Sequence, residues 1–65
     1  MNSNLKFSIV TPSYNEEKDI RETLEYFINL SYPNKEIIVV DDSTDRTPEI
    51  VKEFESQGVR LIRCK

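Results

Sequence analysis

The stretch that most limits what this chain can fold into is Glu36–Asp45, which reads EIIVVDDSTD. Its unbroken run of β-branched apolar residues, Ile37–Val40, predicts a strand buried on both faces, as in the centre of a parallel sheet. Asp is a poor strand former and is costly to bury, so we expect Asp41 and Asp42 just past the carboxyl end of this strand. Ligands bind at that edge of open α/β sheets. The stretch therefore predicts both the middle of the fold and one wall of a site.

A strand and a helix are expected before this stretch. Residues 6–11 predict a strand, because Phe7 and Ile9 alternate with polar residues and Val10 adds a second apolar face. We expect Pro12 to end it, because proline lacks the N–H that a sheet ladder uses. Asn15 is a favourable N-cap for a helix that runs to about Leu30. Apolar side chains recur at i, i+4, i+7 and i+8 from Ile20, which predicts one buried stripe on that helix.

A second helix and a third strand are expected after it. Thr47 and Pro48 predict a helix start with a hydroxyl cap, and we expect Asp45 to serve the same start. Gly58, the only glycine, lies where the C-terminal stop of that helix belongs, and residues 59–63 read as a strand. The predicted fold is α/β, with a β-α-β-α-β order of three strands and two helices. Right-handed crossovers make it half of a doubly wound, Rossmann-like parallel sheet with one bare face.

Composition narrows the function classes. The chain has 65 residues, of which 37% are hydrophobic and 32% charged, and this predicts a single small domain of marginal stability. Its net charge is −3 and its basic residues are scattered, so we expect no nucleic-acid partner. The lone Cys64, expected to be an inert strand residue, predicts a reducing, cytoplasmic location. The absence of His removes the commonest general base and metal ligand. We also expect neither a signal peptide nor a membrane span.

Two polar loops are expected to leave the carboxyl ends of the first and second strands. The first holds Pro12, Tyr14 and Glu16, and the second holds Asp41 and Asp42. If the two strands are neighbours, an aromatic ring in one loop faces a carboxylate in the other, which suits a nucleoside. Stacking of a ring on a base contributes about 1–3 kcal/mol. A hydrogen bond from a base N–H to a carboxylate contributes about 1.5–3 kcal/mol.

Each of these residues also has a structural interpretation. Tyr14 can be an exposed loop aromatic, Asn15 a cap, and Glu16 a partner of the helix dipole. Asp41 and Asp42 are harder to explain in this way, because adjacent acids repel each other and a turn does not need both. Neither loop has a glycine, which excludes a backbone cradle for phosphate. A diphosphate would therefore need a metal or further residues, and the two acids could themselves bind Mg²⁺.

At these residues the chain resembles the family-2 glycosyltransferases, which have the GT-A fold. Those enzymes open with a strand and Pro-Ser/Thr-Tyr-Asn-Glu, followed by a helix and a second strand that ends in Asp-Asp-Gly-Ser-Thr-Asp-Gly-Thr. The matching segments here are residues 11–17, TPSYNEE, and residues 39–47, VVDDSTDRT. The resemblance covers about residues 6–63. The glycine after the acid pair is missing and Arg46 replaces the second glycine, a short form similar to that of cellulose-synthase-like members.

The resemblance implies a nucleotide-sugar site. It implies that Tyr14 lies against the base of the donor, with Pro12 beside it, and that Asp42 accepts a hydrogen bond from the base. It implies that Glu16 and Asp41 line the same pocket. The donor would be a UDP- or GDP-sugar, and the sugar would pass with inversion to an acceptor in polysaccharide or cell-wall synthesis.

The resemblance also implies that the chain, residues 1–65, is an N-terminal fragment of a GT-A domain. The family's Asp-x-Asp metal motif and catalytic base have no match in the sequence, so they would follow Lys65. Mg²⁺ or Mn²⁺ would be held mostly there, and no catalytic residue lies in this chain. The fragment would then have no activity alone. The oligomeric state, and whether the larger enzyme lies at the cytoplasmic face of a membrane, stay open.

A receiver-like regulatory module is the alternative. Residues 36–62 also resemble the start of a phospho-acceptor receiver domain, in which an acid pair after a strand holds Mg²⁺. Against this, the first strand of a receiver carries its acids, whereas here a whole strand–helix unit precedes them and holds Tyr14 and Glu16. A third interpretation is an inert half-fold, which is compatible with a glycosyltransferase parent.

Overall fold

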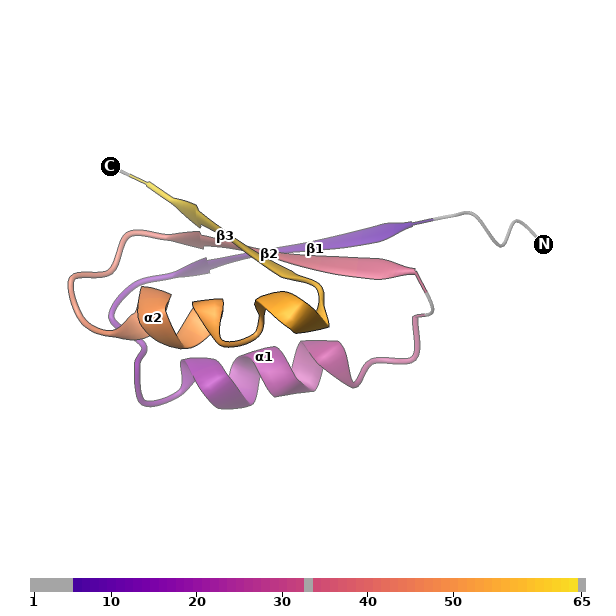
Figure 1. Cartoon of the computed structure of the whole chain (residues 1–65), viewed down its shortest axis with the longest axis horizontal. Coiled ribbons are helices and arrows are strands. Elements are labelled where there is room, and N and C mark those ends of the chain that lie inside the picture. Colours follow the sequence, from indigo (N-terminus) through magenta and orange to yellow (C-terminus); the bar gives the residue numbers. More distant parts are fainter. Residues whose placement is uncertain (1–5, 33, 65) are drawn as a thin grey trace.

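The computed structural model describes residues 6–32 and 34–64, and there it shows a parallel sheet with two helices on one face (Figure 1). The strands are β1 (Phe7–Ser13), β2 (Lys35–Asp41) and β3 (Val59–Arg63), in the spatial order β1-β2-β3. Helix α1 (Ile20–Ile28) joins β1 to β2. Helix α2 (Thr47–Lys52) and a 3₁₀ turn, η1 (Glu55–Gln57), join β2 to β3. The predicted half of a doubly wound α/β sheet is confirmed.

Strand β2 is the central strand, as its apolar run predicts. Ile37 and Val39 are buried on the face that the helices cover, whereas Ile38 and Val40 on the other face are half-buried. The prediction that both faces of this strand are buried is therefore wrong, and the predicted bare face of the sheet is confirmed. The reason is visible in Figure 1, where both helices lie on the same side of the sheet.

The core lies between the sheet and the two helices. Each buried aliphatic side chain in it contributes about 1.5–3 kcal/mol relative to exposure. The buried apolar members are Ile20, Leu24, Ile37, Val39, Val51, Phe54 and Val59. The stripe predicted for the first helix is confirmed, because Ile20 and Leu24 are buried while Phe27 and Ile28 pack against the core. Neither helix in the described part of the chain is long and apolar enough to cross a bilayer.

Strand β1 continues through Pro12, so the prediction that this proline ends the strand is wrong. β1 is an edge strand, and Pro12 pairs in register with Val40. The carbonyl of Ser13 accepts a hydrogen bond from the N–H of Asp42 at 3.1 Å, so Ser13 bonds toward β2. The nitrogen of Pro12 therefore faces the open edge, where the ladder loses no hydrogen bond. As a result β1 reaches as far as the last residue of β2.

Both helix starts differ from the predictions: α1 begins later than expected, and α2 begins one residue earlier. Helix α1 begins at Ile20, after a turn over residues 17–19, so Asn15 is not its N-cap. Thr47 is the first residue of α2 rather than its cap, and Pro48 follows within the first turn. The side chains of Asn15 and Thr47 are engaged instead in contacts between loops, described below.

Gly58 ends the second crossover, as predicted. It follows η1 with φ of 88°, in the left-handed region. A Cβ added there would meet only the backbone oxygen of Lys35, at 4.0 Å. The requirement for glycine is therefore conformational rather than steric.

We expect Gly58→Ala to lower the free energy of unfolding by about 1–2 kcal/mol, since a Cβ disfavours left-handed backbone by that amount. Gly58→Asn should lower the free energy of unfolding by less than Gly58→Ala, because Asn tolerates this conformation better than Ala. Urea denaturation followed by circular dichroism measures both. Ser56→Ala, in the preceding turn, is the control and should leave the midpoint unchanged. An alanine variant as stable as the wild type would contradict the role given to Gly58.

Candidate functional site

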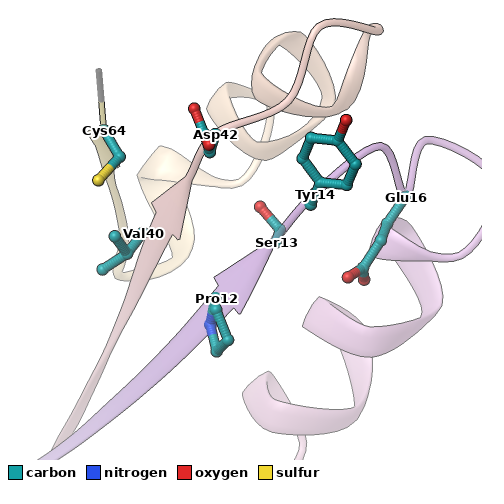
Figure 2. Close-up of a pocket in the computed structure, with 7 residues that line it drawn as sticks. All are labelled: Pro12, Ser13, Tyr14, Glu16, Val40, Asp42 and Cys64. Atoms are coloured by element: carbon teal, nitrogen blue, oxygen red, sulfur yellow. The ribbon is translucent and has the colours of Figure 1, made fainter.

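A pocket opens at the carboxyl ends of β1 and β2, where the two polar loops were predicted (Figure 2). Its volume is about 460 Å³. The residues that line it are Pro12, Ser13, Tyr14, Glu16, Val40, Asp42 and Cys64. The structure thus brings four of the five predicted site residues together: Pro12, Tyr14, Glu16 and Asp42.

Tyr14 and Asp42 present an aromatic ring and a carboxylate at this pocket. The Tyr14 side chain is 62% exposed, so its ring face is available for stacking. Asp42 is the first residue after β2, as predicted, and it is exposed. Within residues 6–32 and 34–64 no side chain or backbone group bonds to its carboxylate. Its backbone N–H donates to Ser13, which fixes the main chain from which the carboxylate projects.

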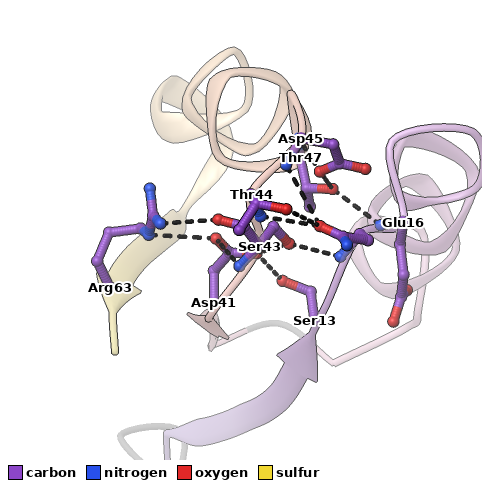
Figure 3. Close-up of polar contacts among 9 residues, drawn as sticks. Ser13, Glu16, Asp41, Ser43, Thr44, Asp45, Thr47 and Arg63 are labelled. Atoms are coloured by element: carbon purple, nitrogen blue, oxygen red, sulfur yellow. Dashed lines mark hydrogen bonds and ion pairs between the residues drawn. The ribbon is translucent and has the colours of Figure 1, made fainter. Parts of the chain in front are cut away.

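Asp41 lies on the opposite side of the strand and does not line the pocket. It is the last residue of β2, and its side chain is fully buried on the helix-covered face. Oδ1 accepts hydrogen bonds from the hydroxyls of Ser13 at 2.5 Å and Ser43 at 2.6 Å, and Oδ2 accepts from the Ser43 N–H at 3.1 Å. Arg63 Nε lies 3.2 Å from Oδ2 (Figure 3). The expectation that the cost of burial keeps both acids beyond the strand is therefore wrong for Asp41, because these partners offset that cost.

The environment of Asp41 favours its ionised form. Burial by itself raises the pKa of the carboxyl, but the hydrogen bonds from Ser13 and Ser43 and the charge of Arg63 together lower the pKa below its usual value. Arg63 also donates from Nη2 to the carbonyl of Ser43 at 2.9 Å, so it holds the loop as well as the acid. In the described part of the chain, every buried side-chain nitrogen and oxygen has a hydrogen-bond partner.

The loop after β1 is hydrogen-bonded to the loop after β2. The Asn15 N–H donates to Ser43 Oγ at 2.7 Å, and Asn15 Oδ1 accepts from the Thr44 N–H at 2.8 Å. The Glu16 N–H donates to Thr47 Oγ1 at 2.9 Å. The two loops therefore form one hydrogen-bonded unit beside the pocket, and the prediction that they lie close together is confirmed.

Asp45 serves the start of α2, as predicted. Its Oδ1 accepts hydrogen bonds from the Thr47 N–H at 2.9 Å and from Thr47 Oγ1 at 2.5 Å. Burial raises the pKa of Asp45, and the hydrogen bonds from Thr47 and Glu17 outweigh that effect and lower it. The carboxylate thus remains an acceptor for the first turn of the helix.

The sequence reasoning missed several residues of this region. Val40 could have been found from strand alternation, because it lies two residues before Asp42 on the uncovered face. Cys64 and Arg63 could not, because their placement depends on the register of β3, which sets Arg63 opposite Asp41. Cys64 has a free, exposed thiol and lies just past β3 rather than within it.

The geometry gives no support to a receiver-like magnesium site. Asp41 is buried against Arg63, whereas Asp42 is exposed at the pocket, so the two carboxylates do not face a common cation. Among residues 6–32 and 34–64, no group of three or more His, Cys, Asp or Glu side chains could hold a metal ion.

Comparison with known proteins places the chain beside glycosyltransferases. A family model described as Glycosyl transferase family 2 matches residues 8–65. YdaM of Bacillus subtilis, named a probable glycosyltransferase, is 54% identical over 52 residues, which are 75% of this chain and 12% of that protein. Poly-beta-1,6-N-acetyl-D-glucosamine synthase of Staphylococcus epidermidis is 44% identical over 48 residues, which are 72% of this chain and 12% of that enzyme.

A solved structure shares both the fold and part of the sequence. The crystal structure of S. aureus TarS 1–349 in complex with UDP matches with a TM-score of 0.84 and 35% sequence identity. The match covers 94% of this chain and 19% of that one. The chain thus spans a small part of each relative, between about an eighth and a fifth of its length.

Neutralising the buried acid should destabilise the fold, whereas neutralising its neighbour should not. We expect Asp41→Asn to lower the free energy of unfolding at pH 7 by about 1–3 kcal/mol, because it removes the charged acceptor of several hydrogen bonds. Asp42→Asn is the matched control, and its urea midpoint should equal that of the wild type. Equal midpoints for the two variants would contradict the division of roles.

The same pair of variants tests the lowered pKa of Asp41. Because the folded-state pKa is lowered, the ionised carboxylate stabilises the fold fully above its unfolded-state pKa of about 3.9. This stabilisation is lost as the pH falls through the lower folded-state pKa. The stability difference between the wild type and Asp41→Asn should therefore narrow as the pH falls below about 4. Urea denaturation between pH 7 and pH 2.5 measures it, and a constant difference would contradict the lowered pKa.

Proposed function

The chain belongs to glycosyl transferase family 2, and from that membership we propose that it is the donor-binding part of a sugar-transferring enzyme. The reaction would move a sugar from a nucleotide-diphosphate sugar to an acceptor, with inversion. The observation that carries the proposal is the exposed Tyr14 ring and the Asp42 carboxylate on one pocket at the carboxyl edge of the sheet. The similarity to a structure that holds UDP supports a nucleotide as the ligand.

In this proposal the pocket binds the base of the donor. The Tyr14 ring stacks on the base with Pro12 beside it, and the Asp42 carboxylate accepts a hydrogen bond from a base N–H. Glu16 lines the same pocket. Asp41 contributes from the buried side by holding Ser13 and the loop that follows Asp42. Uracil and guanine both present an N–H beside a carbonyl, so a UDP-sugar and a GDP-sugar both fit this chemistry.

The remaining chemistry is assigned to residues that this chain does not contain. The pocket carboxylates, Glu16 and Asp42, are assigned to the donor, and no group of three or more His, Cys, Asp or Glu side chains in the described residues could hold a metal ion. We therefore propose that residues 1–65 are the N-terminal portion of a longer GT-A domain. Its further residues would bind Mg²⁺ or Mn²⁺ and activate the acceptor. A cytoplasmic location, at a membrane face or free, stays a prediction.

We expect the isolated chain to bind nucleotide weakly, with a dissociation constant of about 1 mM or more. One stacked ring and one charged hydrogen bond give only a few kcal/mol, and the cost of association offsets much of it. NMR titrations of the labelled chain with UDP, GDP and Mg²⁺, each added separately, measure this. Shifts at Tyr14 and Asp42 with one nucleotide support the proposal and identify the base. A folded chain that responds to neither nucleotide contradicts it, and shifts at the acids with Mg²⁺ alone favour the receiver alternative.

Two tyrosine variants separate stacking from non-specific contact. Tyr14→Ala should weaken nucleotide binding by about tenfold, within the range that a lost base–aromatic stack predicts. Tyr26→Ala is the matched control, since Tyr26 is 65% exposed on α1 and lies outside the residues that line the pocket. Comparable weakening in both variants would show that the pocket is not where the base binds.

We expect no sugar transfer by the isolated chain, because the family resemblance places the metal motif and the catalytic base after Lys65. Within the described residues, no group of three or more His, Cys, Asp or Glu side chains could hold a metal ion. Incubation with UDP- and GDP-sugars and Mn²⁺, followed by assay of released nucleotide diphosphate, measures transfer and donor hydrolysis together. Turnover above a Tyr14→Ala control would refute the assignment of catalysis to residues outside this chain.

A further inference from the structure

Asn15 has a strained backbone that helix capping does not explain. Its φ is 50°, and it is the only non-glycine residue with a positive φ in residues 6–32 and 34–64. Left-handed backbone is disfavoured for residues with a Cβ, although Asn tolerates it better than most. Helix α1 begins only at Ile20, so the strain serves no helix start. Strained residues that the surrounding structure holds in place are often found at functional sites.

The side chain and the backbone of Asn15 both bond to the loop after β2. Its N–H donates to Ser43 Oγ at 2.7 Å. Its Oδ1 accepts from the Thr44 N–H at 2.8 Å and also lies 3.3 Å from Thr44 Oγ1 and from the Asp45 N–H. The left-handed turn thus lets one residue reach three consecutive residues of the facing loop.

These contacts complete a pair of bridges around the pocket residues. The inner bridge is the hydrogen bond from Ser13 to Asp41. The outer bridge is the set of hydrogen bonds that join Asn15 to Ser43, Thr44 and Asp45. Ser13 and Asn15 flank Tyr14, whereas Asp41 and Ser43 flank Asp42. The Ser43 hydroxyl joins the two bridges by donating to Asp41 (Figure 3). Each of the two pocket residues is therefore held on both sides to the opposite loop.

We propose that Asn15 is a positioning residue for the nucleotide base, an inference that rests on the proposed function. The outer bridge holds the Tyr14 ring and the Asp42 carboxylate at a fixed separation, so a base meets both groups without first ordering the loops. The inner bridge cannot do this alone, because it fixes only the strand ends. If the loops were not held in this way, the entropy cost of ordering them during binding would weaken the affinity.

The Asn15→Gly variant separates this role from a merely conformational one. Glycine adopts the left-handed backbone readily and keeps the N–H, but it removes the acceptor for Thr44 and Asp45. If Asn15 is needed only to make the turn, glycine replaces it fully. Asn15→Asp keeps both the turn and an acceptor oxygen, so it should restore function. Asn29→Gly, at the C-cap of α1, is the matched control.

The test is a UDP titration of all four chains, followed by NMR under conditions in which each shows a folded, dispersed spectrum. We expect Asn15→Gly to raise the apparent Kd about five- to tenfold, as when the competent loop arrangement falls to a fifth or a tenth of the population. Asn15→Asp should lie within about twofold of the wild type, and Asn29→Gly should match it. An Asn15→Gly variant that binds UDP as tightly as the wild type would overturn the inference.

Amide hydrogen exchange of the wild type tests the same bridge without a variant. The Thr44 N–H should be protected, because Asn15 Oδ1 accepts from it, and exchange at the rate of a free loop amide would overturn the inference. A wild type that binds no UDP would refute the proposed function. Failure of the inference alone gives a different result, namely a wild type that binds UDP and a glycine variant that binds it equally well.

Discussion

The site depends on one buried carboxylate. Asp41 is fully removed from water, and an ionised group in that position is tolerated only if its oxygens are bonded and its charge is balanced. The partners come from separate parts of the fold: Ser13 from β1, Ser43 from the loop, and Arg63 from β3. Satisfying one acid therefore draws the carboxyl ends of all three strands of the sheet to a common point.

The two neighbouring acids have different roles because successive side chains of a strand point to opposite faces of the sheet. Asp41 points toward the helices, and Asp42 follows it at the pocket. Their repulsion is limited, because Arg63 lies against the buried one. A doubled acid at the end of a central strand thus provides a structural anchor and an exposed acceptor in consecutive positions. A single Asp could not face both sides.

The charge of the pocket agrees with recognition of a base rather than of phosphate. Its charged lining residues, Glu16 and Asp42, are both acids. Neither flanking loop has a glycine, so no backbone cradle is formed. The nearby Arg63 is bonded to Asp41 and to the Ser43 carbonyl rather than directed at the pocket. A diphosphate would need charge supplied from elsewhere, whereas a neutral base with an N–H donor suits the groups at hand.

The sequence by itself determined the order of elements, the central strand and four of the seven residues that line the pocket. These follow from local properties: the apolar run Ile37–Val40, the helical stripe from Ile20, and the stop at Gly58. Only the tertiary structure decided what lies across the chain from each residue. Pro12 stays in its strand because that strand is at the edge, and Asp41 is buried because the strand register brings Arg63 opposite it. Asn15 bridges two loops rather than capping a helix, because a side chain takes the partners that packing brings near, and sequence spacing does not encode them.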